Sequence, residues 1–145
     1  MFLGAHLDSV TEGPGIQDNG SGSAAILEIA LQLAGRFGVN ETGQQSYNLN
    51  KAVRFGWWGA KESGIFGSFD YVTSLTAAEL DQIGVYLSFD MIGSPNFVRF
   101  VYDGDSSDTT PIVPPPPGSA AVEQVFLDYF SGQGLETKAF EFELR

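Results

Sequence analysis

The sequence predicts an α/β fold with a mainly parallel sheet, and three observations support this. Short apolar runs typical of buried strands recur along the 145 residues. Segments with one apolar stripe at helical spacing lie between these runs. The polar side chains best suited to chemistry directly follow the apolar runs, which is where open α/β sheets bind ligands.

The composition is that of a single globular domain. Hydrophobic residues make up 43% and aromatic residues 13% of the chain, which excludes the polar, aromatic-poor disordered class. Eighteen acidic against seven basic residues give a net charge of −11, which disfavours nucleic acid and anionic membranes and favours cations such as metal ions. Cysteine is absent, so disulfides, thiolate metal sites and a cysteine nucleophile are excluded.

The first half of the chain is expected to form a parallel strand–helix–strand unit. Residues 1–7 are typical of a short buried strand, and the Gly, Ser and Asp content of 9–23 indicates a loop. The run at 52–60 is apolar enough to predict a strand buried on both faces, after a polar surface connection at 40–51. The helix between the strands is predicted from Gly22 to about Phe37, because apolar residues recur there every three or four positions: Ile26, Ile29, Ala30, Leu33 and Phe37.

Two short helices and two further strands are predicted next. The helices cover 65–75 and 76–83, and the second has Thr76 as its N-cap with Glu79 completing a capping box. The strands cover the apolar run 84–93 and the alternating run 96–105.

A proline-rich loop leads into the last predicted helix. Four prolines at 114–117 are expected to stiffen this loop as polyproline II, and we interpret it as a rigid entry to a helix rather than as a ligand for an SH3-type domain. The helix covers Ser119 to Phe130 and presents an apolar stripe of Val122, Val125, Phe126, Tyr129 and Phe130.

The two ends of the sequence resemble the interior of a longer chain. The first residues are strand-like and lack the basic and long apolar regions of a signal peptide, and residues 139–145 are strand-like as well. No apolar run reaches the roughly 18 residues that a membrane span needs. We therefore expect a piece of a larger protein with no membrane partner in this part.

A histidine and several carboxylates are expected to meet at the carboxyl edge of the sheet. Such nitrogen and oxygen donors suit zinc and, less well, manganese or cobalt. Their number exceeds what one tetrahedral ion requires, which favours a two-metal site with a bridging carboxylate. The residues are His6 and Asp8 after the first strand, Asp18 in the first loop, Lys61 and Glu62 after the second strand, and Asp90 at the end of the third.

Each of these residues also has a plainer interpretation. Asp18 alone fits an Asx-turn or a helix N-cap. His6 fits a partly buried side chain at a strand end, and Glu62 and Asp90 fit solvated acids. The metal-site hypothesis depends on their joint placement, in which Asp8 is positioned to accept the second ring N–H of His6.

Three motifs carry a resemblance to a known family. GAHLDSV followed by GPGIQDNGSGSAA, then VRFGWWGAKESGIFGS, then YLSFDMIGSPN resemble, in order and spacing, the zinc aminopeptidases of the aminopeptidase Y and bacterial leucyl aminopeptidase type, peptidase family M28 of clan MH. The resemblance covers residues 3–97 and continues through 119–135. It implies a three-layer α/β/α sandwich with a mixed, mainly parallel sheet (the di-zinc exopeptidase fold), of which residues 1–145 form an incomplete peptidase catalytic domain.

The resemblance also implies a function and a role for each site residue. His6 and Asp90 would bind one zinc ion, Glu62 the other, and Asp18 would bridge them, with Asp8 behind His6. The family removes N-terminal residues from peptides with two zinc ions, so zinc is the expected cofactor and peptides with a free N-terminus are the expected partners. A secreted or vacuolar location is likewise implied by the resemblance alone.

Two departures from the family pattern predict impaired activity. The family has Ala-Glu-Glu where this chain has AKE, so Lys61 occupies the catalytic position of the general base, and an ammonium cannot accept a proton. A distant histidine completes the second metal site in the family, whereas His6 is the only histidine here. The family binds two zinc ions, and we expect this chain to bind two, one or none. The alternatives to an impaired aminopeptidase are a non-catalytic metal- or peptide-binding relative and a nonfunctional fragment.

Overall fold

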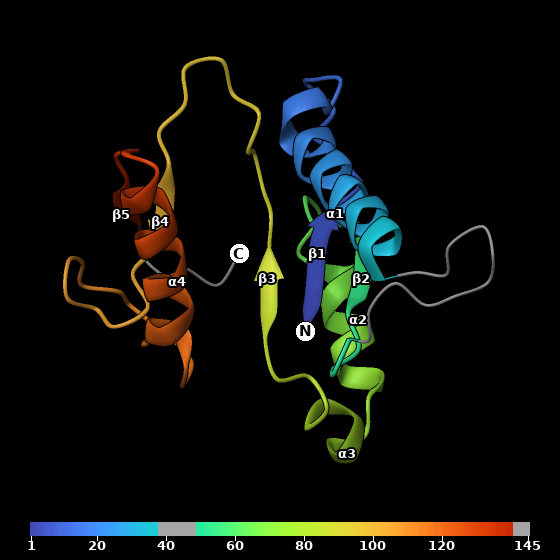
Figure 1. Cartoon of the computed structure of the whole chain (residues 1–145). Coiled ribbons are helices and arrows are strands. Elements are labelled where there is room, and N and C mark those ends of the chain that lie inside the picture. The colour runs from blue at the N-terminus through green and yellow to red at the C-terminus, as the bar shows by residue number, and fades with distance from the viewer. Residues whose placement is uncertain (38–48, 141–145) are drawn as a thin grey trace. The chain divides into compact units, whose positions relative to one another are not determined.

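Strand β1 (Phe2–His6) is the centre of a three-stranded parallel sheet in the computed structural model, which describes residues 1–37 and 49–140. Strand β2 (Arg54–Trp58) pairs with one edge of β1 and β3 (Tyr86–Ser88) with the other, and Figure 1 shows the three strands side by side. Helix α1 (Gly22–Phe37) connects β1 and β2. The predicted parallel strand–helix–strand unit is therefore confirmed.

The two faces of this sheet are covered by different elements. On one face Leu3 and Ala5 form a buried cluster with Ile26 of α1. On the other face the ring of Phe2 contacts Tyr71 of helix α2 (Phe66–Ser74) at a centroid distance of 5.7 Å. The apolar stripe predicted for α1 is confirmed, because its members are buried or half-buried and most other positions of the helix are exposed.

The prediction that residues 52–60 form a strand buried on both faces is wrong. All five residues of β1 are buried, whereas β2 is half-buried, with Trp57 36% exposed. The physical reason is the strand order β2-β1-β3, in which only β1 has a neighbour on each side among the described strands.

The predicted capping box is confirmed: Thr76 Oγ1 accepts the N–H of Glu79 at the start of α3 (Ala77–Leu80), and the Glu79 carboxylate accepts the N–H of Thr76.

Residues 1–95 and 96–145 form two compact units, and the second contains its own parallel strand pair. Strand β4 (Phe100–Tyr102), shorter than the run predicted at 96–105, pairs with β5 (Lys138–Phe140). Helix α4 (Ser119–Gly132) begins at the predicted residue, after Gly118, which follows the prolines. Most of the predicted connection at 40–51 and the end of the run at 139–145 lie outside the described residues.

The apolar stripe predicted for α4 is only partly correct. Val125 and Tyr129 are 67% and 61% exposed, whereas Glu123 is only 7% exposed. Glu123 Oε2 accepts the backbone N–H of Gly104 at 2.8 Å, so the helix turns this acid toward the loop that follows β4. A hydrogen bond between distant segments thus overrides the apolar pattern of the helix.

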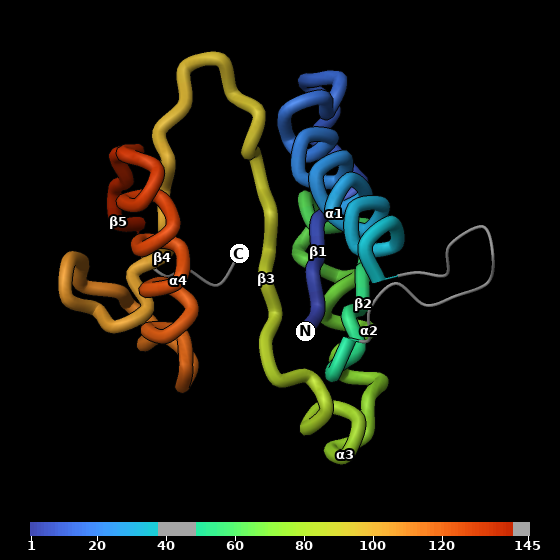
Figure 2. Tube along the Cα trace, viewed as in Figure 1, coloured from blue at the N-terminus to red at the C-terminus, as the bar shows by residue number. Residues whose placement is uncertain are grey.

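The loop after β4 is organised by one buried carboxylate, and its path can be followed in Figure 2. Asp103 is fully buried, and its carboxylate accepts hydrogen bonds from the N–H groups of Ser107, Asp108 and Thr109 and from the Thr109 hydroxyl. Burial by itself raises the pKa of Asp103, but the hydrogen bonds from Thr109, Asp108 and Ser107 outweigh it and lower the pKa to about 2.

This carboxylate gives a pH-dependent prediction. The amide resonance of Thr109 is expected to titrate with a midpoint near pH 2, below the ~3.9 of an unperturbed aspartate. Because the native pKa is lowered, the stabilisation is complete above the unfolded pKa and is lost as the pH falls through about 2. Asp103→Asn should therefore lower the melting temperature at pH 7 but much less near pH 2. A midpoint near 4 by NMR would contradict this account.

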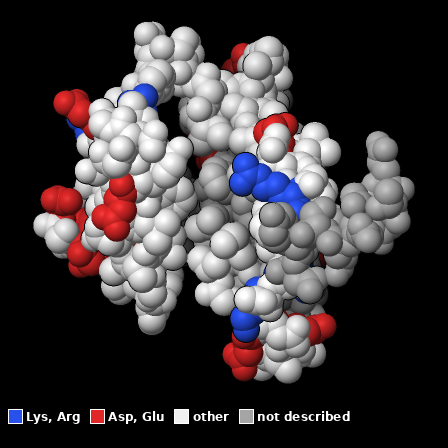
Figure 3. Space-filling model, viewed as in Figure 1, with Lys and Arg blue, Asp and Glu red and all other residues white. Residues whose placement is uncertain are grey.

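Figure 3 shows acidic side chains dispersed over both units on the face in view rather than gathered in one patch. None of the helices among the described residues combines the length and apolarity needed to cross a bilayer.

Candidate metal centre

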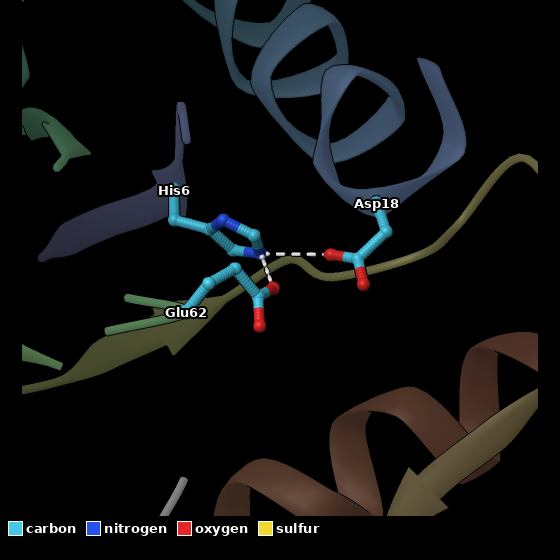
Figure 4. A group of neighbouring side chains, drawn as sticks. All are labelled: His6, Asp18 and Glu62. Carbon is cyan, nitrogen blue, oxygen red and sulfur yellow. Dashed lines mark ion pairs between the residues drawn. The ribbon is translucent and has the colours of Figure 1, made fainter. Parts of the chain in front are cut away.

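The predicted metal ligands converge at the carboxyl end of β1. His6 Nε2 lies 3.0 Å from an oxygen of Asp18, 3.4 Å from one of Asp90 and 3.8 Å from one of Glu62. Figure 4 shows the Asp18 and Glu62 side chains directed at the imidazole from separate segments. The ligand atoms of His6, Asp18 and Glu62 all lie within 4.8 Å of one another, close enough to share a metal ion.

The fold explains why these residues meet. Parallel strands end at the same edge of a sheet, so the residues after β1, β2 and β3 become neighbours. Asp18 comes from η1 (Ile16–Ser21), a π-helical turn whose backbone leaves helical geometry at Asp18 and Asn19. Ala60 and Met91, next to Lys61 and Asp90, adopt the left-handed conformation with φ of 56° and 51°. Such strain in residues other than glycine is concentrated at functional sites.

The electrostatics at His6 fit a bound cation. His6 Nδ1 is 3.0 Å from the backbone carbonyl of Asp8, which can only accept, so Nδ1 carries the proton. In the neutral ring the Nε2 lone pair then faces the carboxylates. Nε2 and Asp18 Oδ1 are both buried, and neither has a hydrogen-bond partner among the described residues. A cation between these lone pairs satisfies both atoms, which are of the type that zinc prefers.

Asp8 links β1 to the segment that carries Lys61 and Glu62. One oxygen of its carboxylate accepts the N–H of Lys61 and the other the N–H of Glu62, each at 3.0 Å. Burial raises the pKa of Asp8, but these N–H groups outweigh it and lower the pKa. The carboxylate is 3.4 Å from His6 Nδ1, farther than the backbone carbonyl of Asp8 itself. Asp8 therefore supports the site from behind the imidazole.

Lys61 forms ion pairs with two of the candidate ligands. Its Nζ lies 3.0 Å from Glu62 Oε1 and 3.4 Å from Asp90 Oδ2. Burial lowers the pKa of Lys61, but the hydrogen bond to Glu62 and the charges of Asp90, Asp18 and Glu62 outweigh it and raise the pKa. The ammonium is thus held in its charged form by the carboxylates that would bind metal.

Asn19 has a role in the structure that was not predicted from the sequence. The amide oxygen of Asn19 accepts the N–H of Gly22 at 2.9 Å, so Asn19, and not Asp18, caps the start of α1. The N-cap interpretation of Asp18 is therefore wrong, and its carboxylate is directed to His6. An Asn three residues before a helical glycine is a capping signal that could have been read from the sequence.

A second acidic group needs no cation. Asp103, Asp105 and Glu123 in the second unit lie close enough to hold an ion. Their oxygens accept backbone N–H groups of Ser107 and Gly104, which accounts for the arrangement.

Comparison with known proteins identifies the family. The family model described as Peptidase family M28 matches residues 1–131. An aminopeptidase of Pseudomonas aeruginosa (strain UCBPP-PA14) is 51% identical over all 145 residues, and leucine aminopeptidase 2 of Trichophyton equinum is 48% identical over 135 residues, or 93% of this chain. The chain spans about a quarter (25%) of the length of these curated relatives. It belongs to peptidase family M28.

Proposed function

We propose that this chain supplies the metal-binding part of an aminopeptidase-type peptide hydrolase. The observation that carries the proposal is the buried Nε2 of His6, which has no hydrogen-bond partner among the described residues and faces carboxylates from three other segments. Membership of family M28 and the names of the relatives provide the reaction class.

Each residue of the metal centre would have its own role. His6, Asp18, Asp90 and Glu62 would hold zinc. A bound zinc ion supplies Lewis acidity and lowers the pKa of a water. Asp8 fixes the backbone of the segment that carries Glu62, and its backbone carbonyl fixes the tautomer of His6.

The architecture of the first unit supports a finer fold assignment. Helix α1 contacts Leu3 and Ala5 on one face of the sheet, and Tyr71 of α2 contacts Phe2 on the other. We propose that this is part of the three-layer sandwich of the di-zinc exopeptidases, and that residues 1–145 are a partial catalytic domain.

Peptides with a free N-terminus are the proposed substrates. Asp18 and Asp90 are 33% and 38% exposed, so the acidic site is open to solvent and attracts an ammonium group. A secreted or vacuolar location is part of the same proposal and rests on the family resemblance.

A non-catalytic metal- or peptide-binding protein is the second candidate. It is favoured by the ion pairs of Lys61 with Glu62 and Asp90, which place a lysine charge beside two proposed metal ligands. In such a protein the ammonium would replace one zinc ion.

The test uses the 145-residue chain and a chimaera of the P. aeruginosa aminopeptidase in which this chain replaces the quarter that it matches. Release of p-nitroaniline from leucine p-nitroanilide is measured with and without a chelator, together with zinc content. We expect zinc binding in both proteins and weak, chelator-sensitive hydrolysis in the chimaera. Zinc binding without hydrolysis would favour the second candidate. Absence of both in a chain that folds stably would likewise favour the second candidate, with the ammonium in place of zinc. Absence of both in a chain that does not fold stably would contradict both candidates and favour a nonfunctional fragment.

A further inference from the structure

We propose that the side chains of Gln17, Asn19 and Ser21 form a clasp that fixes Asp90 beside Asp18, with Asn19 as the principal positioning residue. The clasp is defined as these three side chains and the backbone of residues 89–93 that they bind. Because the inference treats Asp18 and Asp90 as metal ligands, it rests on the proposed function.

Asn19 binds the backbone on both sides of Asp90. Its Nδ2 donates to the carbonyl of Phe89 at 2.8 Å, and its Oδ1 accepts the N–H of Met91 at 3.2 Å. The residue is only 1% exposed, so its amide depends on these partners and on Gly22. Asp90 is thus held between two peptide groups that one buried side chain binds.

Gln17 and Ser21 extend the same contact along the chain. Gln17 Nε2 donates to the carbonyl of Met91 at 2.7 Å, and its Oε1 accepts the N–H of Gly93 at 3.1 Å. Ser21 Oγ accepts the N–H of Ile92 at 3.1 Å. Alternate residues of η1 therefore bind residues 89–93, while Asp18 between them is directed to His6.

The hydrogen bonds of the clasp replace the backbone hydrogen bonds of the sheet where strand β3 ends. Strand β3 stops at Ser88, and the N–H of Phe89 makes the last bond to β1, at Gly4. The next backbone groups of this segment bind side chains of the clasp instead. Met91 has a left-handed backbone, which persists in a residue other than glycine only when its surroundings hold it. Both its N–H and its carbonyl are held by the clasp.

The position of one proposed ligand is thereby coupled to that of another. Asp18 is the direct neighbour of Asn19 in the chain, and Asp90 lies between the two backbone groups that Asn19 binds. Loss of the Gln17 and Ser21 bonds would leave Asp18 attached to α1 and free the segment that carries Asp90, whereas loss of the Asn19 side chain would in addition remove the cap of α1 at Gly22. The inference therefore predicts a defect in metal coordination, beyond a general loss of stability.

The experiment compares the 145-residue chain with Asn19→Ala, Gln17→Ala and the control Gln32→Ala, an exposed amide on α1 that donates to Glu28 on the same helix and lies outside the clasp. Zinc affinity is measured by calorimetry, and the visible spectrum of the Co²⁺ form reports the ligand geometry. We expect Asn19→Ala to weaken zinc binding about 10- to 100-fold and to change the Co²⁺ spectrum. Gln17→Ala should change both in the same direction but less, and Gln32→Ala should change neither.

Gln17→Ala removes two bonds of the clasp without opening a buried cavity, so it tests the inference even if Asn19→Ala does not fold. Faster hydrogen exchange at the amides of Met91, Ile92 and Gly93 would show that the clasp was released. Unchanged zinc affinity and Co²⁺ spectra in folded variants with faster exchange would overturn the inference alone. Absence of metal binding in the parent chain would overturn the proposed function and the inference with it.

Discussion

Lys61→Glu is expected to raise the rate of leucine p-nitroanilide hydrolysis by the chimaera about 10²- to 10⁴-fold, the usual contribution of a general base. The ammonium of Lys61 has no lone pair to accept a proton, and it forms ion pairs with Glu62 and Asp90. A carboxylate at this position supplies the acceptor and frees both neighbours for metal. Steady-state kinetics with zinc present, together with metal content, measures the two effects.

Two further variants separate the effect of the Lys61 charge on metal binding from the effect of the absent general base on turnover. Lys61→Gln removes the ammonium without adding a base, so it should increase zinc content but leave turnover low. Lys51→Glu makes the same charge change at an exposed residue outside the site and should alter neither. If Lys61→Glu binds zinc fully and still shows no gain in rate, the lysine is not what limits catalysis.

The candidate site could be predicted from the sequence because its geometry follows from sheet topology. His6, Glu62 and Asp90 each come directly after an apolar strand-like run, and parallel pairing brings the ends of these strands together. The stripe of α1 and the capping box at Thr76 are local patterns, and both are present in the structure. Local periodicity and strand order thus account for most of the first unit.

The features that sequence reasoning missed depend on partners far away in the chain. The half-buried state of β2 depends on the strand order and not on its own apolar residues. Glu123 is buried because Gly104 offers an N–H group, and Asn19 binds backbone groups 70 and 72 positions away. The spacing of apolar residues within one helix or strand carries no information on such contacts. Polar residues that are buried by long-range hydrogen bonds are therefore the ones most easily misread.

Zinc is expected to stabilise the 145-residue chain, and His6→Asn is expected to abolish this effect. A ligand that binds only the native state at 100 times its Kd contributes about 2.7 kcal/mol, which for a chain of this size raises Tm by about 10 °C. The asparagine amide can replace the donor at His6 Nδ1 but offers nothing at Nε2, the atom that faces Asp18. Thermal melts with zinc and with a chelator measure the shift.

The zinc-dependent shift in melting temperature has to be assigned to a site, because an acidic chain offers other carboxylates as zinc ligands. Asp105→Asn alters the acidic group of the second unit, where Asp105 is exposed, and it should leave the zinc-dependent shift intact. A shift that survives in His6→Asn but disappears in Asp105→Asn would assign the stabilising ion to the second unit and contradict the proposed centre. A shift that disappears only in His6→Asn requires Nε2, since the variant retains every carboxylate of the site. The Nε2 atom of His6 at the end of β1, which faces the carboxylates, would then account for the metal dependence of the fold.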